Sequence, residues 1–180
     1  VLTNSEVDVN THGDWVLTGI LEGVNDDDTL IERSGEVLVR EADVLPGISP
    51  FQVTTLGQTI NSGALHLGDN GNVLWFGTWS DPDTTSNRGL FLNDRLLVRQ
   101  NVTTVGGELI TLLEGTAGSY ALSDDGERVV FRARVTGNEP VVVVVDVGPW
   151  TSLGGALAGT GGVMPCLLYT SPSPRDLYRS

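Results

Sequence analysis

The fold is decided by the stretch Leu67-Gly68-Asp69-Asn70-Gly71-Asn72-Val73-Leu74-Trp75-Phe76-Gly77, because the chain repeats its pattern twice more. The other two copies are Val9-Asn10-Thr11-His12-Gly13-Asp14-Trp15-Val16-Leu17-Thr18-Gly19 and Leu122-Ser123-Asp124-Asp125-Gly126-Glu127-Arg128-Val129-Val130-Phe131-Arg132. In each copy a turn rich in Asn, Asp and Gly separates a short apolar segment from a longer one. Gly13, Gly71 and Gly126 recur at spacings of 58 and 55 residues. A regular period of this size indicates a tandem-repeat architecture.

The apolar residues come in blocks of four to eight, and clusters of Gly, Asp, Asn and Ser separate these blocks. This pattern is typical of an all-β protein. We expect a first short strand in each repeat at residues 6–9, 64–67 and 119–122. The second strand is expected at residues 14–21, 72–79 and 127–135. The glycine of each intervening turn is expected to adopt a positive φ angle, which glycine reaches without steric cost.

Two further strands of each repeat are predicted to form a hairpin. The expected hairpins are residues 29–33 with 36–41, and residues 88–92 with 95–100, which align without a gap. In the third copy residues 140–146 supply the third strand, and no fourth strand is clear. A four-stranded antiparallel meander describes one blade of a β-propeller.

The sequence therefore predicts a β-propeller-like region over residues 1–148, with blades at about 1–47, 48–107 and 108–148. Three blades cannot close a ring of four to eight, so the predicted fold is an incomplete array. The alternative is a single β-sandwich whose self-similarity is accidental.

The second strands differ between the repeats. In the first two repeats these strands are apolar on both faces, so both faces are expected to meet a neighbouring sheet. In the third repeat one face is apolar and the other carries Arg128, Val130, Arg132 and Arg134. We expect this arginine face to meet solvent or an acidic loop, and the third blade to end the array.

The composition excludes some functions. The formal net charge is −13, and the basic residues are all arginines. Such a charge argues against binding to nucleic acids and to anionic membrane surfaces, and it suits a salty or extracellular medium. The longest apolar run, residues 141–145, is far shorter than the roughly 18 residues that span a membrane.

The C-terminal part of the chain differs from the repeats. Residues 149–165 are rich in glycine and small residues, and are expected to be a linker or the start of a truncated next domain. Residues 166–180 resemble the translation of an adapter used in transposase-based sequencing libraries, and Cys166, the only cysteine, falls within them. The chain also begins without Met. We therefore expect a piece of a longer protein with a non-native tail, and further repeats outside it.

Two resemblances to known families support the repeat interpretation. Residues 121–131 are similar to the S-x-D-G-x-x-h-x-F blade motif of TolB-like propellers. The pattern of residues 1–148 resembles bacterial secreted tandem-repeat proteins with an N-x-x-G-x-x-x-F unit, which Asn10-Thr11-His12-Gly13 matches in part. These resemblances imply a propeller-like fold at an extracellular or cell-surface location. They imply no catalytic residues.

Two acidic loops are the best candidates for a metal site. Asp26, Asp27 and Asp28 follow the second strand of the first repeat, and Asp81 and Asp83 occupy the same position in the second. Calcium takes six to eight oxygen ligands, and such loops offer several. Neither loop follows the calcium-loop pattern with its distal Glu, so the pattern favours ordinary solvated loops over a calcium site.

No other residues indicate a reaction or a cofactor. His12 and His66 lack a partner at metal-binding spacing, and are expected to be ordinary surface or packing residues. An enzyme would have to use a pair of carboxylates, as glycosidases do. Asp69 and Asp124 lie in equivalent turns, which favours a role in turn formation. The sequence therefore predicts a non-catalytic secreted or cell-surface module for binding, adhesion or scaffolding, with an unknown protein or glycan ligand. The alternative is an arc of a propeller enzyme that acts on glycans through loop carboxylates.

Overall fold

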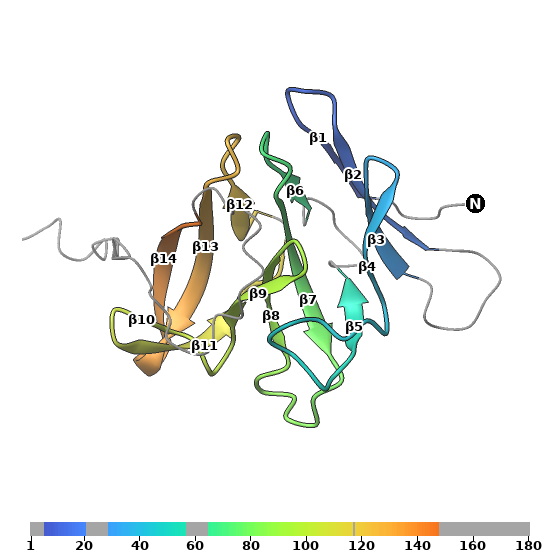
Figure 1. Cartoon of the computed structure of the whole chain (residues 1–180). Helices are drawn as coiled ribbons and strands as arrows, with labels where there is room; N and C mark the ends of the chain where they lie inside the picture. Colours follow the sequence, from blue (N-terminus) through green and yellow to red (C-terminus); the bar gives the residue numbers. More distant parts are fainter. Residues whose placement is uncertain (1–5, 21–28, 57–64, 117, 148–180) are drawn as a thin grey trace, which may run out of the picture.

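The computed structural model describes residues 6–20, 29–56, 65–116 and 118–147, and these form an all-β array of three antiparallel sheets (Figure 1). The only helical element among them is a 3-10 turn, η1 (Thr136–Asn138). None of the sheets is closed. The prediction of an all-β, blade-like array is confirmed. No helix in the described residues has the length and apolar character that crossing a membrane requires.

The first sheet is the meander β1 (Val7–Val9), β2 (Trp15–Ile20), β3 (Thr29–Arg33) and β4 (Glu36–Arg40). The second sheet contains β5 (Val53–Leu56), β6 (His66–Leu67), β7 (Val73–Trp79), β8 (Arg88–Leu92) and β9 (Arg95–Arg99). The third contains β10 (Thr104–Val105), β11 (Glu108–Leu113), β12 (Tyr120–Leu122), β13 (Arg128–Val135) and β14 (Glu139–Asp146).

In the second and third sheets two short strands share one edge of the long central strand. β6 pairs with the start of β7 and β5 with its end, while β8 covers the opposite edge. In the same way β12 pairs with the start of β13 and β11 with its end, while β14 pairs along the whole of β13. The strands β5, β10 and β11 were not predicted from the sequence. The third sheet gains an additional strand from β11, which precedes β12 in the chain, and not from a strand after β14.

The sheets share irregularities of strand pairing at equivalent positions. The pairing shifts between Val53 and Thr55 in the second sheet, and between Ile110 and Leu112 in the third. The β3–β4 and β8–β9 hairpins also share a shift at the same position. Each shift is a β-bulge or irregularity that alters the local twist of its strand, so these sheets are bent in equivalent places.

The core consists of two apolar clusters, one on each face of the second sheet. Toward the first sheet, Trp75 stacks on Phe91 with ring centroids 4.2 Å apart, and Trp79 meets Phe91 edge-on. Toward the third sheet, Leu74 and Phe76 belong to the cluster that includes the apolar face of β13. The second sheet therefore has both faces buried, as its sequence predicts.

The third sheet has one buried and one open face. Val129, Phe131, Ala133 and Val135 are buried against the second sheet. Arg128, Val130 and Arg132, which alternate with them, are exposed, and Arg134 is half-buried. The prediction that the arginine face meets solvent is confirmed for the described residues.

Removing the side chain of Phe131 tests the joint between the second and third sheets. We expect Phe131→Ala to lower the free energy of unfolding by about 3–5 kcal/mol, because it leaves a cavity in a fully buried cluster. Val130→Ala, next to it on the exposed face, is the matched control and should cost less than about 1 kcal/mol. Urea unfolding followed by tryptophan fluorescence measures both, and equal losses would contradict the assignment of the two faces.

Candidate functional site

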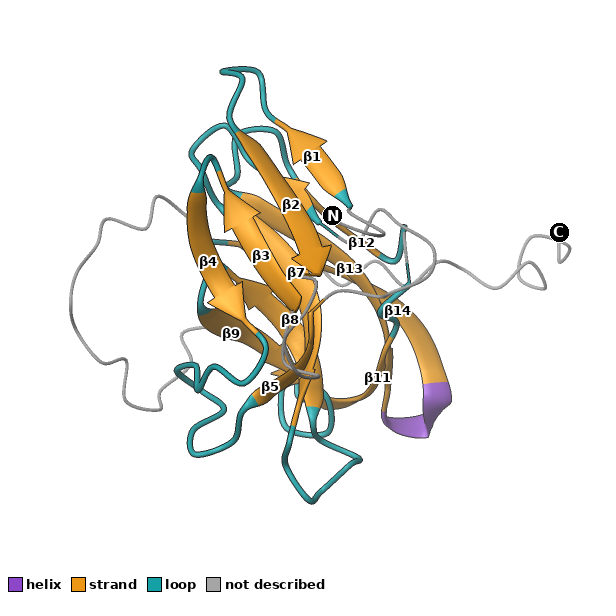
Figure 2. Cartoon of the chain, turned by 90° about the vertical axis from the view of Figure 1, so that its right-hand side faces the viewer, coloured by secondary structure: helices purple, strands orange, loops and turns teal. Residues whose placement is uncertain are grey.

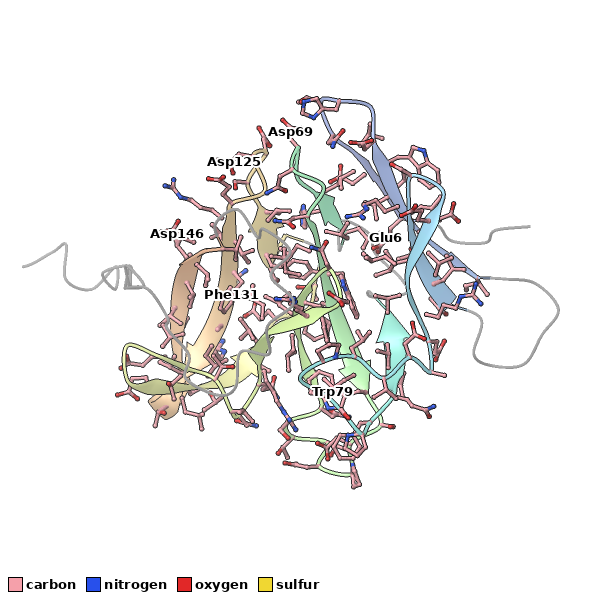
Figure 3. All side chains as sticks on the ribbon, viewed as in Figure 1. Glu6, Asp69, Trp79, Asp125, Phe131 and Asp146 are labelled. Atoms are coloured by element: carbon pink, nitrogen blue, oxygen red, sulfur yellow. The ribbon has the colours of Figure 1, made fainter. Side chains whose placement is uncertain are left out.

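The three repeated turns lie in a row at one end of the molecule (Figures 1 and 3). Their glycines have φ angles of 85° at Gly13, 81° at Gly71 and 71° at Gly126, as the sequence predicts. In each turn a side-chain oxygen of Asn10, Asn70 or Asp125 accepts a backbone N–H two residues further on. This local bond shapes the turn and explains why these positions hold Asn or Asp.

Amide side chains join each turn to the next. Asn10 Nδ2 donates to the carbonyl of Gly68 at 3.4 Å, and Asn72 Nδ2 donates to the carbonyl of Gly126 at 3.0 Å. Asn72 is buried, and it also accepts a hydrogen bond from Asn93 Nδ2. A Cβ atom on Gly68 would lie 2.4 Å from the Cα of Gly126, so the second and third turns touch through their backbones.

The carboxylates of the turns form part of the same network. Asp8 Oδ2 accepts the backbone N–H of Leu67 at 2.8 Å, and Asp69 Oδ1 accepts that of Thr11 at 2.9 Å. Hydrogen bonds from Thr11 lower the pKa of Asp69. The pKa of Asp125 is lowered by the hydroxyl of Ser123 and the backbone of Glu127. Asp69 and Asp125 therefore stay ionised, and all three carboxylates serve as acceptors within or between turns.

The calcium candidates in the loop between β7 and β8 have donors from the protein. Asp81 Oδ2 pairs with Arg99 Nη2 at 2.8 Å. Asp83 accepts hydrogen bonds from the side-chain hydroxyls of Thr85 and Ser86, and these bonds lower the pKa of Asp83. Arg99 also bonds to the carbonyl of Ser86 and lies over the Trp79 ring, 5.3 Å from its centroid.

The described residues contain no group of three or more His, Cys, Asp or Glu side chains that could hold a metal ion. Asp26, Asp27 and Asp28 lie outside the described residues, so the loop of the first repeat cannot be compared. The calcium candidates stay a prediction. The ion pair of Asp81 was not foreseen, since its partner Arg99 is distant in sequence.

The two histidines lie in different surroundings. His12 is in the exposed first turn, with Nδ1 3.9 Å from Asp69 Oδ1. The ring of His66 packs edge-on against Tyr120, with ring centroids 5.7 Å apart. Burial raises the pKa of the Tyr120 hydroxyl, so Tyr120 stays protonated at neutral pH.

The outer faces of the first and third sheets, at opposite ends of the array, are covered by no described sheet. On the third sheet, Arg128 pairs with Asp146 at 2.9 Å and Arg132 with Glu114 at 3.5 Å. Val130 lies between Arg128 and Arg132 on β13, and Val142 pairs with Arg132 across the strands. Val130 and Val142 are 37% and 40% exposed. We call the surface of Val130, Val142 and the three arginines of β13 the arginine face.

The outer face of the first sheet is turned toward the viewer in Figure 2. Val7, Val9 and Val37 are 65%, 60% and 44% exposed, and Trp15 and Leu17 beside them are half-buried. Glu32 pairs with Leu17 across the strands and with Val37 in the hairpin, so it lies in the middle of this surface. We call these six residues the valine face. The strand pattern predicts a partner for it, and none of the described sheets supplies one.

No protein-family model, curated protein or solved structure matches this chain.

Two amide-to-acid substitutions test the hydrogen bonds that join one repeated turn to the next. We expect Asn72→Asp to lower the free energy of unfolding by about 1–3 kcal/mol, because it replaces a buried donor to Gly126 with an acceptor. Asn70→Asp is the matched control, since its side-chain oxygen still accepts the Asn72 N–H. Thermal unfolding of the two variants should show the larger loss for Asn72→Asp. The reverse order would show that the amide bond between turns contributes little.

Calcium binding by the β7–β8 loop is testable by melting temperature. We expect the same value in millimolar calcium and in chelator, because Arg99, Thr85 and Ser86 already occupy the carboxylate oxygens. A calcium-dependent rise that Asp83→Asn removes would place a site in this loop. A rise that survives Asp81→Asn and Asp83→Asn would point instead to residues 26–28.

Proposed function

We propose that this chain is a secreted or cell-surface repeat module that binds or scaffolds other molecules through the outer faces of its end sheets. The observation that carries the proposal is that the outer face at each end of the array combines exposed valines with charged side chains. Exposed patches that combine apolar side chains with charged ones are typical of interaction sites. The ligand class that we propose is a protein or glycan.

The turn and loop carboxylates support a non-catalytic role. Asp69, Asp83 and Asp125 all have a lowered pKa, because each accepts hydrogen bonds from its own turn or a neighbouring one. A glycosidase needs one carboxyl with a raised pKa as proton donor. These three groups have the opposite shift, so they suit structural acceptors better than general acids.

The alternative function is cleavage of glycans. It draws on the closeness of Asp69 to Asp125, whose charge acts to raise the pKa of Asp69 against the stronger effect of Thr11. The two carboxylates lie at adjacent turns, at the end of the molecule where Figure 3 labels them. The alternative function depends on this closeness of two carboxylates.

The location is proposed from composition. A net charge of −13 keeps the chain soluble and repels nucleic acids and anionic lipid surfaces. Together with the repeated blades, this charge suits a medium outside the cell.

One assay separates the two functions. The full chain is applied to a panel of immobilised polysaccharides and peptides, and both its retention and the release of reducing ends are measured. We expect retention by at least one member, no release of reducing ends, and weaker retention of a triple variant with Arg128, Arg132 and Arg134 changed to Ala. Release of reducing ends that Asp69→Asn with Asp125→Asn abolishes would instead establish the glycan enzyme. Failure to bind any member would remove the support for a binding module.

A further inference from the structure

The two end faces are related by the repeat. The second sheet turns one face toward the first sheet and the other toward the third, and both are buried. The valine face is the equivalent, in the first repeat, of the second-sheet face that packs on the first sheet. The arginine face is the equivalent, in the third repeat, of the second-sheet face that packs on the third. The described sheets pack through two such contacts, first on second and second on third. The two outer faces are therefore the two sides of a contact of the same kind, each without its partner sheet.

The pairing of β7 and β13 with their preceding short strands shows which residue of the second sheet corresponds to each β13 residue of the arginine face. Val73 and Val129 each pair with the last residue of the preceding short strand, so they are equivalent positions. Three residues further on, Phe76 of β7 corresponds to Arg132 of β13. Phe76 is buried in the joint between the second and third sheets, whereas Arg132 is exposed.

The same comparison places Glu32. On the strand next to each central strand, the equivalent residues are Glu32, Phe91 and Val143, which pair with Leu17, Trp75 and Phe131. Phe76 and Val143 belong to one buried cluster, which spans the joint between the second and third sheets. If that joint were repeated at the open ends, Arg132 would stand in the position of Phe76 and Glu32 in the position of Val143.

We propose that a second copy of this chain docks head to tail, with its valine face on the arginine face of the first copy. The joint brings Glu32 of one copy to Arg132 of the next, and packs Val7, Val9 and Val37 against Val130 and Val142. The proposal rests on the proposed binding function, and names its partner as the chain itself. Because two different faces meet, the contact leaves one face of each kind free, so it continues into a ring or an open array.

Two forces act on this joint in opposite directions. Each copy carries a net charge of −13, which opposes association at long range. At about 0.15 M salt the screening length is about 8 Å, so this repulsion is largely removed, while an ion pair at closest contact is retained better. Asp146, the present partner of Arg128, is exposed, and an exposed ion pair contributes little that docking would lose. Glu114, the partner of Arg132, is half-buried, and this 3.5 Å contact leaves the Arg132 side chain 60% exposed for a second carboxylate.

The test uses the full chain, with a reductant present because Cys166 is a free thiol that links copies if oxidised. Sedimentation velocity at about 0.15 M salt should show a mean mass that rises with protein concentration. Arg132→Glu and Glu32→Arg should each weaken association by about tenfold or more, because each places like charges in the joint. Arg95→Glu makes the same charge change on β9, away from both faces, and should associate as the wild type does.

The decisive measurement is an equal mixture of the two variants. In the mixture, the introduced Glu at position 132 of one variant meets the introduced Arg at position 32 of the other. The native Arg132 of the second variant meets the native Glu32 of the first, so both contacts between unlike copies join opposite charges. We expect the mixture to recover association, although each variant alone stays monomeric and folded by circular dichroism. A wild type that stays monomeric at all concentrations, or a mixture that does not recover, would overturn the proposal. Retention on the polysaccharide and peptide panel would then still support a binding module.

Discussion

The rest of the structure depends on the second sheet having no solvent face. β7 and β8 carry aromatic and aliphatic side chains on both sides, so a sheet must cover each side to keep them from water. This requirement places the first sheet against Trp75 and Phe91, and the third against Leu74 and Phe76. The neighbours themselves need only one apolar face for this purpose. The arginines of β13 show that the third sheet satisfies that minimum and exposes its other side.

Apolar contact alone does not set how the sheets are positioned, because hydrophobic packing is not directional. The turns supply the direction. Asn10 and Asn72 donate to glycine carbonyls of the next turn, and Asp8 and Asp69 accept backbone N–H groups across the first joint. Each sheet is thus held to its neighbour at one end by polar bonds and along its length by packing. This also explains why acids recur in turns without the raised pKa of a proton donor.

Much of this fold was predictable from local pattern. The β3 and β8 strands have the bounds that alternation and turn residues predict, and the glycines of the three turns have the expected φ angles. Of the missed strands, β5 and β10 are short, and β11 is apolar but was not recognised because its partner β13 follows it at a distance in the chain. The role of Asp81 was not foreseen either, since it depends on Arg99 from another strand. Pattern thus predicts which face of a strand is apolar, whereas partners distant in sequence become visible only in three dimensions.

One edge of β7, and one edge of β13, pairs with two separate strands, and this arrangement affects how such a chain can evolve. β5 and β6 pair separately with β7, and β11 and β12 pair separately with β13. Each of these strands has its own register with the central strand. Residues added between the two strands of a pair therefore change neither register, and they leave the same apolar residues facing the core. Doubling the length of a flexible connection costs only about 0.6 kcal/mol in closure entropy. These two positions are therefore where insertions can accumulate, and where a grafted peptide or small domain would be tolerated without rebuilding the sheet.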